Sequence, residues 1–293
     1  MLFFLLAMGL TTSPVPDQAL AARIREMTNQ MLLSQSDSEE SAIDKAVQEI
    51  YARHGLLATP EVGDEAAYDF VFLLTNQPRA FQTEVLRSLE LPGVEHRLPT
   101  DAVTFFRTRF RLDGIKSKSQ DKPPSNLALR DAINKLYESD QAARQKEGFD
   151  PERLAATDRM HSEQLQAIFK KYGVPTFDMV GPEAAGHFVI MIQHQSPQMR
   201  DLVLPALRSA VDAGQADPES YALVYDLSQV DKGKKQLFGE RLVCNSGELH
   251  EAPIEDEEHV NQRRAEIGLM RIELYSNLVA RTMPQMCSAP LPH

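Results

Sequence analysis

The chain has 293 residues, of which 42% are hydrophobic and 25% charged, so it is a globular protein long enough for two domains. Its formal net charge of −11 repels phosphate backbones, and the absence of tryptophan removes the best base-stacking side chain. These features argue against nucleic acid as a partner and leave a small molecule or a peptide.

The N-terminal residues 1–10 form an apolar run that is too short to span a bilayer, which needs about 20 residues. The run is typical of a signal peptide, and Ala19-Leu20-Ala21 supplies a cleavage box. We therefore predict a leader over residues 1–21 and a periplasmic or secreted protein. No basic residue precedes the run, so a buried segment of a cytoplasmic protein is the alternative. No other segment is long and apolar enough for a transmembrane helix.

An internal repeat is the most informative feature of the sequence. When the chain is shifted by 118 positions, residues 50–74 show nine identities with the second copy, where unrelated sequences give about one or two. Gly55 falls on Gly173, and Val62-Gly63 falls on Val180-Gly181. The repeat predicts two tandem related units, residues 22–120 and 125–293, joined by a linker at Lys116–Pro124.

Both copies are predicted to be helical and to share one plan. In each, an amphipathic helix ends at a glycine, which can adopt the left-handed conformation that closes a helix. A strongly apolar segment follows, and helix-capping residues before it favour a buried helix over a buried strand. A second helix ends near Leu89 or Leu207. The expected segments are a helix at 17–33, a polar break at 34–40, helices at 43–54 and 160–172, and apolar segments at 66–74 and 184–192.

The second unit has further elements. We predict a helix at 126–146 closed by Gly148, a β-hairpin of residues 236–243 and 248–253, and helices at 255–267 and 270–281. Cys244 and Cys287 either form one disulfide, as in exported proteins, or stay as two thiols. The predicted fold class is mainly α, with two tandem related helical units, of which the second carries the small hairpin and C-terminal helices.

Polar residues that only the second copy has are candidates for chemistry. Gln193-His194 replaces Thr75-Asn76, His161 replaces Ile43, and Asp226 replaces Thr108. Because imidazole titrates near neutral pH, His194 and His161 could act as general acid and base. The alternatives are a metal site with Asp226 or Asp256 as third ligand, and structural histidines bonded to backbone carbonyls. His187, inside the apolar run, is expected to pack in the core.

Several residues are predicted to bind substrate. Arginine suits bidentate recognition of carboxylate or phosphate, but salt bridges to the acidic residues 255–258 are the competing interpretation for the Arg-Arg pair. For Arg144, one turn after Asp140, the competing interpretation is a surface ion pair. The predicted substrate-binding set is Gln193, Arg263, Arg264, Arg144 and Gln236. The motifs of dinucleotide enzymes, phosphate-loop nucleotidases, zinc proteases and α/β-hydrolases are missing, which argues against these classes of enzyme.

The second half resembles a bacterial domain family of unknown function over about residues 130–275. The matching residues occur in the family's order: Asp140-Gln141 with Arg144, His161, Tyr172-Gly173-Val174-Pro175, Val180-Gly181, Gln193-His194, Leu204-Pro205, Asp226, Gln236 with Gly239, Pro253-Ile254, and Arg263-Arg264 before Gly268-Leu269. The chain departs from the pattern at Val174, where the family has Trp, and at Leu227, Phe238 and Glu240-Arg241. The resemblance implies no activity.

The leading hypothesis is an exported enzyme, a hydrolase or a lyase. His194 and His161 would supply the acid–base groups, Asp226 would orient one of them, and Arg263 or Arg264 would hold an anionic group of the substrate. The alternative is a non-catalytic helical module that binds a peptide or protein and has structural histidines. Substrate, cofactor and oligomeric state are not predicted.

Overall fold

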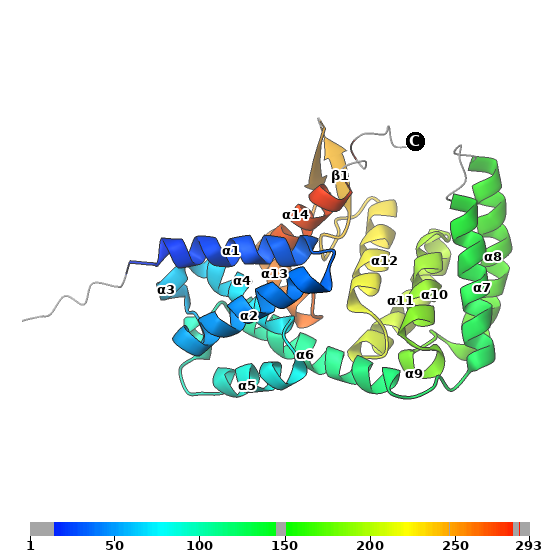
Figure 1. Ribbon diagram of the computed structural model, residues 1–293. Helices are drawn as coiled ribbons and strands as arrows, with labels where there is room; N and C mark the ends of the chain where they lie inside the picture. Colours follow the sequence, from blue (N-terminus) through cyan, green and yellow to red (C-terminus); the bar gives the residue numbers. More distant parts are fainter. Residues whose placement is uncertain (1–14, 145–150, 246, 284–286, 288–293) are drawn as a thin grey trace, which may run out of the picture. The chain divides into compact units, whose positions relative to one another are not determined.

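The computed structural model describes residues 15–144, 151–245, 247–283 and 287 (Figure 1). These residues confirm the mainly α fold class: helices α1–α14 dominate, and one two-stranded antiparallel sheet is the only sheet in the described ranges. The chain forms two compact units, Met1–Val103 (unit 1) and Thr104–His293 (unit 2). Among the described helices, none has the length and apolar character needed to cross a membrane.

Unit 1 is built around α4 (Asp64–Thr75), in which residues 66–74 are all buried. The predicted buried helix is therefore confirmed over the alternative strand. Burying a side chain such as Phe70 or Leu73 contributes about 2 kcal/mol. The helices that pack on α4 are α1 (Gln18–Leu33), α2 (Asp37–His54), α3 (Thr59–Val62) and α5 (Arg79–Leu89). Unit 1 also contains the 3-10 turn η1 (Glu95–Arg97) and the start of α6 (Thr100–Gln120).

Helix α1 begins inside the predicted leader. Asp17 caps it, because its carboxylate accepts a hydrogen bond of 3.0 Å from the backbone N–H of Leu20. Ala21 is fully buried, and the backbone N–H of Asp17 donates to the Glu61 carbonyl. The cleavage box at Ala19-Leu20-Ala21 thus lies in the first turn of a helix that belongs to the folded unit. Residues 1–14 lie outside the described residues.

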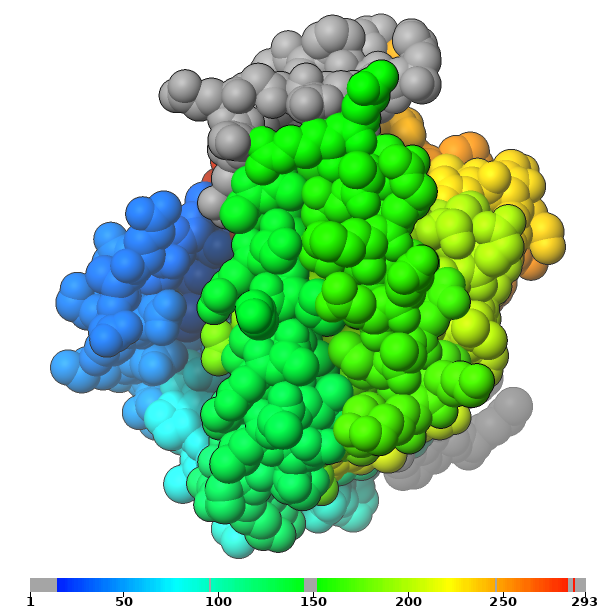
Figure 2. Space-filling model, turned by 90° about the vertical axis from the view of Figure 1, so that its right-hand side faces the viewer, coloured from blue at the N-terminus to red at the C-terminus, as the bar shows by residue number. Residues whose placement is uncertain are grey.

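Unit 2 is built around α10 (Pro182–Gln193), whose buried residues include Phe188 and Met191. Helices α7 (Leu127–Arg144) and α8 (Pro151–Tyr172) lie side by side, and α7 also packs on α10 (Figures 1 and 2). The remaining helices are α9 (Phe177–Val180), α11 (Pro197–Asp212), α12 (Pro218–Asp231), α13 (Val260–Glu266) and α14 (Ile272–Thr282), with the 3-10 turn η2 (Glu257–His259). The predicted closing residue Gly148 lies outside the described residues.

Elements of the two units correspond at the offset of 118 residues. α3 and α4 match α9 and α10 residue for residue at both ends, and α5 and α11 also start 118 positions apart. Gly55 and Gly173 close α2 and α8 with φ of 68° and 71°, and each donates its N–H to the carbonyl four residues earlier at 2.8 Å. The predicted helix-closing role of these glycines is confirmed.

Three predicted boundaries are wrong. The polar break is shorter than residues 34–40, because Ser36 caps α2 and the acidic residues after it form a favourable first helical turn. The linker predicted at 116–124 is helical to Gln120, and the division between units falls inside α6. The helix predicted at 255–267 starts only at Val260, because Asp256 adopts a left-handed conformation with φ of 48°.

The C-terminal part of unit 2 contains the predicted hairpin in a shorter form, β1 (Leu242–Asn245) paired with β2 (Glu248–Glu251). Cys244 in β1 and Cys287 form a disulfide, so of the two open alternatives the structure has the bond. The disulfide attaches the segment after α14 to the hairpin.

Candidate functional site

One polar cluster of unit 2 centres on Asp140, near the end of α7. Its carboxylate accepts two hydrogen bonds from Arg144, at 3.1 and 3.0 Å. Nδ1 of His194, the residue that caps α10, lies 3.3 and 3.2 Å from the two carboxylate oxygens. Nδ1 of His161, on α8, lies 3.9 Å from the same carboxylate. We call Asp140, Arg144, His161 and His194 the Asp140 cluster.

Helical spacing explains how these residues meet. Leu129, Ile133, Leu136 and Asp140 recur at the interval that places side chains on one face of a helix, and this face of α7 packs on α10. Asp140 therefore lies at the end of an apolar stripe and is 1% exposed. Arg144 is one turn further on and also pairs with Asp158 of α8 at 2.6 Å. The competing interpretation for Arg144 is a surface ion pair; the ion pair is present, but it joins a buried carboxylate to a partly exposed guanidinium.

The partners of Asp140 keep it ionised. Burial would raise the pKa of this carboxyl, but hydrogen bonds from His194 and Arg144 outweigh burial and hold the pKa well below its usual range. In the tautomer with its proton on Nδ1, His194 donates to Asp140, so Nε2 is left as the basic atom. About a quarter of the His194 side chain is exposed to solvent.

His161 is the unsatisfied member of the Asp140 cluster. It is 1% exposed, and neither of its ring nitrogens has a hydrogen-bond partner in the described structure. A buried polar group without a partner costs free energy, and native proteins keep few of them. A structural histidine bonded to a backbone carbonyl, the competing interpretation, does not describe this geometry.

Arg200 fixes the turn that presents His194. This buried arginine of α11 donates Nη1 to the carbonyls of Gln193 and Gln195, on either side of His194, and pairs through Nη2 with Asp231. Gln193 ends α10, and its side chain makes no hydrogen bond among the described residues. The structure thus places Gln193 and Arg144, two residues predicted to bind substrate, beside or within the Asp140 cluster.

Asp226 lies elsewhere and has a different task. Its carboxylate accepts hydrogen bonds of 2.7–3.1 Å from the backbone N–H groups of Leu237, Phe238 and Glu240. Burial raises the pKa of Asp226, against the lowering effect of these N–H donors. The expectation that Asp226 orients a histidine is corrected: it anchors the loop before β1, and Asp140 contacts the histidines instead.

Gln236 and the two arginines of α13 also bind mainly backbone. Gln236 is fully buried and donates to the carbonyls of Arg241 and Ala252. Arg264 donates to the carbonyls of Phe238 and Met270 and pairs with Glu240 at 2.8 Å. Arg263 donates to the carbonyls of Leu237 and Glu255 and pairs with Asp256. Because these donors are already engaged, the predicted substrate contacts of Gln236, Arg263 and Arg264 give way to a structural role in the C-terminal part.

The structure does not place Asp226 or Asp256 as the third ligand of a metal site with His161 and His194. Asp226 binds backbone, and Asp256 is an exposed residue 2.8 Å from His259. Within the described ranges, no group of three or more His, Cys, Asp or Glu side chains is arranged to hold a metal ion.

His187 lies between α10 and α7, where its ring stacks on Tyr137 at a centroid distance of 3.7 Å. Nδ1 of His187 is 3.0 Å from the Asn134 side-chain oxygen. Burial lowers the pKa of His187, which favours the neutral ring. This half-buried histidine packs between the two helices, two turns before His194 on the same helix.

Two comparisons with known proteins found nothing: no curated protein and no solved structure matches the chain. The model of a family of unknown function, DUF6624, does match the chain, over residues 128–284. This range includes the whole Asp140 cluster and confirms the resemblance to a domain family of unknown function.

Proposed function

The chain belongs to the family of unknown function DUF6624, and from the geometry of unit 2 we propose that it is an enzyme that uses acid–base catalysis at the Asp140 cluster. The reaction class that this geometry supports best is hydrolysis or elimination. The observation that carries the proposal is the buried Asp140 carboxylate, which lies 3.2 Å from the partly exposed His194 and 3.9 Å from the buried His161, whose ring makes no hydrogen bond.

The roles follow from the contacts. Asp140 holds the His194 ring through Nδ1, so Nε2 can take a proton from water or from a carbon acid and return it to the leaving group. Arg144 keeps Asp140 ionised, because its guanidinium donates two hydrogen bonds to the carboxylate. His161 is 1% exposed, so its unpaired ring nitrogens would bind a buried water molecule beside Asp140 and not the substrate itself.

The competing hypothesis is a non-catalytic module that binds a peptide or protein through a groove. It requires both histidines to be structural. The position of His161 favours the catalytic proposal, because its ring lies 3.9 Å from the Asp140 carboxylate and makes no hydrogen bond to a backbone carbonyl.

The residues at the matched positions of unit 1 support a site that is confined to unit 2. Asn76 stands 118 positions before His194, and Ile43 stands 118 positions before His161. We infer that the units are related copies and that unit 1 lacks the acid–base residues.

The test uses the full chain and needs no prior choice of substrate. Wild-type protein and His194→Ala are incubated with a small-molecule extract of bacterial cells, and mass spectrometry compares the compounds consumed. We expect at least one compound whose turnover falls by about 100-fold or more in His194→Ala. The matched control is His187→Gln, two turns earlier on α10, which should retain turnover. Equal turnover by wild type and His194→Ala, or none by either, contradicts the proposal.

Export is also part of the proposal. The Cys244–Cys287 disulfide supports it, because such bonds persist in oxidising compartments. Cell fractionation is the check, and we expect the protein in the periplasmic or secreted fraction with the bond formed. Recovery in the cytoplasm with both thiols free would contradict export.

A further inference from the structure

The side chain of Arg241 is a free cation on a fixed backbone. It is partly exposed and makes no hydrogen bond or ion pair within the described ranges, and its Nε is buried. Gln236 fixes the backbone: its side-chain oxygen accepts from the Arg241 N–H at 2.8 Å, and its amide nitrogen donates to the Arg241 carbonyl at 3.1 Å. A guanidinium placed in this way is suited to a ligand, because arginine recognises carboxylate and phosphate in a fixed geometry.

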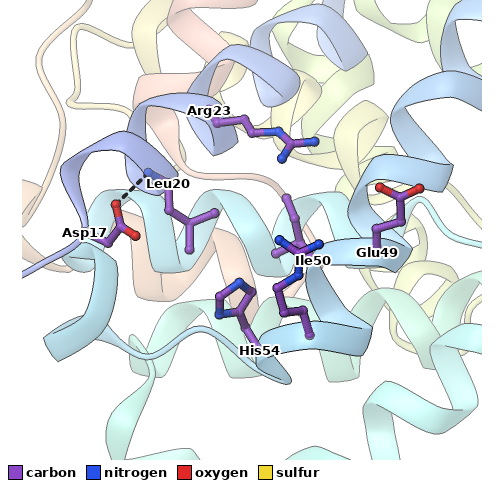
Figure 3. Close-up of a pocket in the computed structure, with 7 residues that line it drawn as sticks. Asp17, Leu20, Arg23, Glu49, Ile50 and His54 are labelled. Carbon is purple, nitrogen blue, oxygen red and sulfur yellow. Dashed lines mark hydrogen bonds between the residues drawn. The ribbon is translucent and has the colours of Figure 1, made fainter.

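Two unpaired arginines of unit 1 provide a contrast. Arg23 and Arg53 line a surface hollow between α1 and α2 together with Asp17 and Glu49 (Figure 3). Two carboxylates there balance two guanidinium groups, so this hollow has no excess of positive charge with which to attract an anion.

The carboxylates near Arg241 are bonded to other cations. Burial lowers the pKa of Arg200, and the positive charge of Arg241 lowers it further, which places the two guanidinium groups within electrostatic range of each other. Asp231 pairs with Arg200 itself. Asp201, the other carboxylate that acts on Arg200, pairs with Lys232 at 2.6 Å. Among these groups three cations meet two carboxylates, and Arg241 is the cation without a partner.

Arg241 lies at the same end of unit 2 as the Asp140 cluster. Helix α10 follows α9 directly, and the residues just before α7 and α12 share backbone hydrogen bonds with α9. These three helices therefore end on the side of unit 2 opposite α9, as Figure 1 shows. The ends of α7 and α10 carry Asp140 and His194, and α12 leads into the loop with Arg241. The carboxylates of Asp140 and Asp158 are bonded to Arg144, so neither is the partner of Arg241.

We propose that the substrate of the Asp140 cluster carries an oxyanion, a carboxylate or a phosphate, that binds the guanidinium group of Arg241. The inference rests on the proposed function and adds the substrate class to it. Arg200 adds electrostatic attraction only, because its Nη groups bind Asp231 and the carbonyls on either side of His194. The reacting part of the substrate extends from Arg241 toward Nε2 of His194.

This task was expected of the two arginines of α13. Arg263 and Arg264 cannot perform it, because their donors bind backbone carbonyls and the carboxylates of Asp256 and Glu240. Arg241, in the loop between α12 and β1, has its donors available.

Calorimetric titration of the full chain with inorganic phosphate and with acetate tests the oxyanion site, because neither probe requires turnover. At low ionic strength, where charges are weakly screened, we expect saturable binding of at least one probe with a Kd of about 1 mM. The probe that binds more tightly identifies the oxyanion as phosphate or carboxylate. Arg241→Gln should weaken binding by about tenfold, because it removes the charge and keeps a polar side chain of similar shape.

The matched control is Lys235→Gln, which removes the same charge from an exposed residue of the same loop. This variant should leave the Kd within about twofold of wild type. His194→Ala should bind the probes as wild type does. The proposal is overturned if neither probe binds, or if Arg241→Gln and Lys235→Gln have the same effect while circular dichroism shows both variants folded.

Turnover separates this inference from the proposed function. The compounds that wild type consumes and His194→Ala does not should be anions. For one of them, Arg241→Gln should raise KM by about tenfold and leave kcat within about threefold, because it removes binding energy shared by ground state and transition state. Consumption of neutral compounds with an unchanged KM in Arg241→Gln overturns this inference alone. Probe binding that depends on Arg241, without turnover of any compound, supports the oxyanion site and contradicts only the proposed function.

Discussion

At the scale of single residues, Asp140 combines two properties that rarely occur together. It is buried, and it is charged with three side chains donating to it, those of Gln141, Arg144 and His194. A buried carboxylate is stable only when such partners replace its lost hydration. The carboxylate therefore links the stability of unit 2 to the geometry of His194.

Substitution of Asp140 should show this link as a pH dependence. Because the folded-state pKa lies below the ordinary value of 3.8, the interactions of Asp140 are fully present above that pH and are lost as pH falls toward the lower folded-state pKa. Asp140→Asn should lower the free energy of unfolding by about 2 kcal/mol at pH 7. The difference from wild type should shrink below pH 3.8. Urea denaturation at pH 7 and pH 3 measures both values.

Asp131→Asn on the same helix is the control. Asp131 is 64% exposed and pairs with Arg130 at the surface, so its loss should cost less than about 0.5 kcal/mol. A penalty for Asp140→Asn that is equally large at both pH values would contradict the assigned charge.

At the scale of elements, the end of α10 and the end of α4 are held in the same way by different side chains. In unit 1, Nε2 of Gln82 donates to the carbonyls of Thr75 and Gln77 at 2.7 and 2.9 Å. Unit 2 has the same three positions 118 residues later, where Arg200 donates to the carbonyls of Gln193 and Gln195. A neutral amide is thus sufficient to close this turn.

The corresponding prediction concerns Arg200. Arg200→Gln should retain stability to within about 1 kcal/mol, because glutamine already performs this task in unit 1. Arg200→Leu should cost about 3 kcal/mol, because two buried carbonyls lose their donor. Chemical denaturation of both variants is the measurement. If Gln and Leu are equally destabilising, the two turns are not equivalent.

The helices were predictable because their signals are local. Gly55 closes α2 through its own backbone conformation, and the apolar residues of α4 need no knowledge of distant partners. The linker was predicted wrongly because its structure depends on distant contacts. Residues 116–120 have a polar composition, but Ser119 is buried and accepts a hydrogen bond from Gln215. Propensity read along the chain cannot include such tertiary contacts.

The candidate site was only partly predictable. His161 and His194 were selected because unit 1 lacks them, and both lie at one carboxylate. Asp140 was missed as a site residue although its spacing from Leu129 and Ile133 places it on the buried face of α7. Asp226 was misassigned because a sequence shows a carboxyl group but not the backbone N–H groups that surround it.

At the scale of the whole molecule, one covalent bond joins regions that are distant in sequence. Cys244 and Cys287 are 43 positions apart, and the segment between them contains β2, α13 and α14. Closing a loop of this length restricts the unfolded chain, which in the chain-entropy account stabilises the folded state by about 4 kcal/mol.

Reduction should therefore weaken unit 2. We expect the free energy of unfolding measured with guanidinium to fall by about 2–4 kcal/mol when a reductant is added. The double variant Cys244→Ser/Cys287→Ser should be destabilised by a similar amount and should not respond to reductant. A wild-type protein whose unfolding is the same with and without reductant would contradict a stabilising role for the bond.

The same disulfide changes what a protease can release. A single cut between residues 245 and 286 opens the backbone inside the ring that the Cys244–Cys287 bond closes. The two fragments stay attached to each other, so the nicked chain runs at full mass on a gel until the bond is reduced. After a cut that lies before α13, the C-terminal fragment with α13 and α14 therefore stays bound to the rest of the chain through the disulfide.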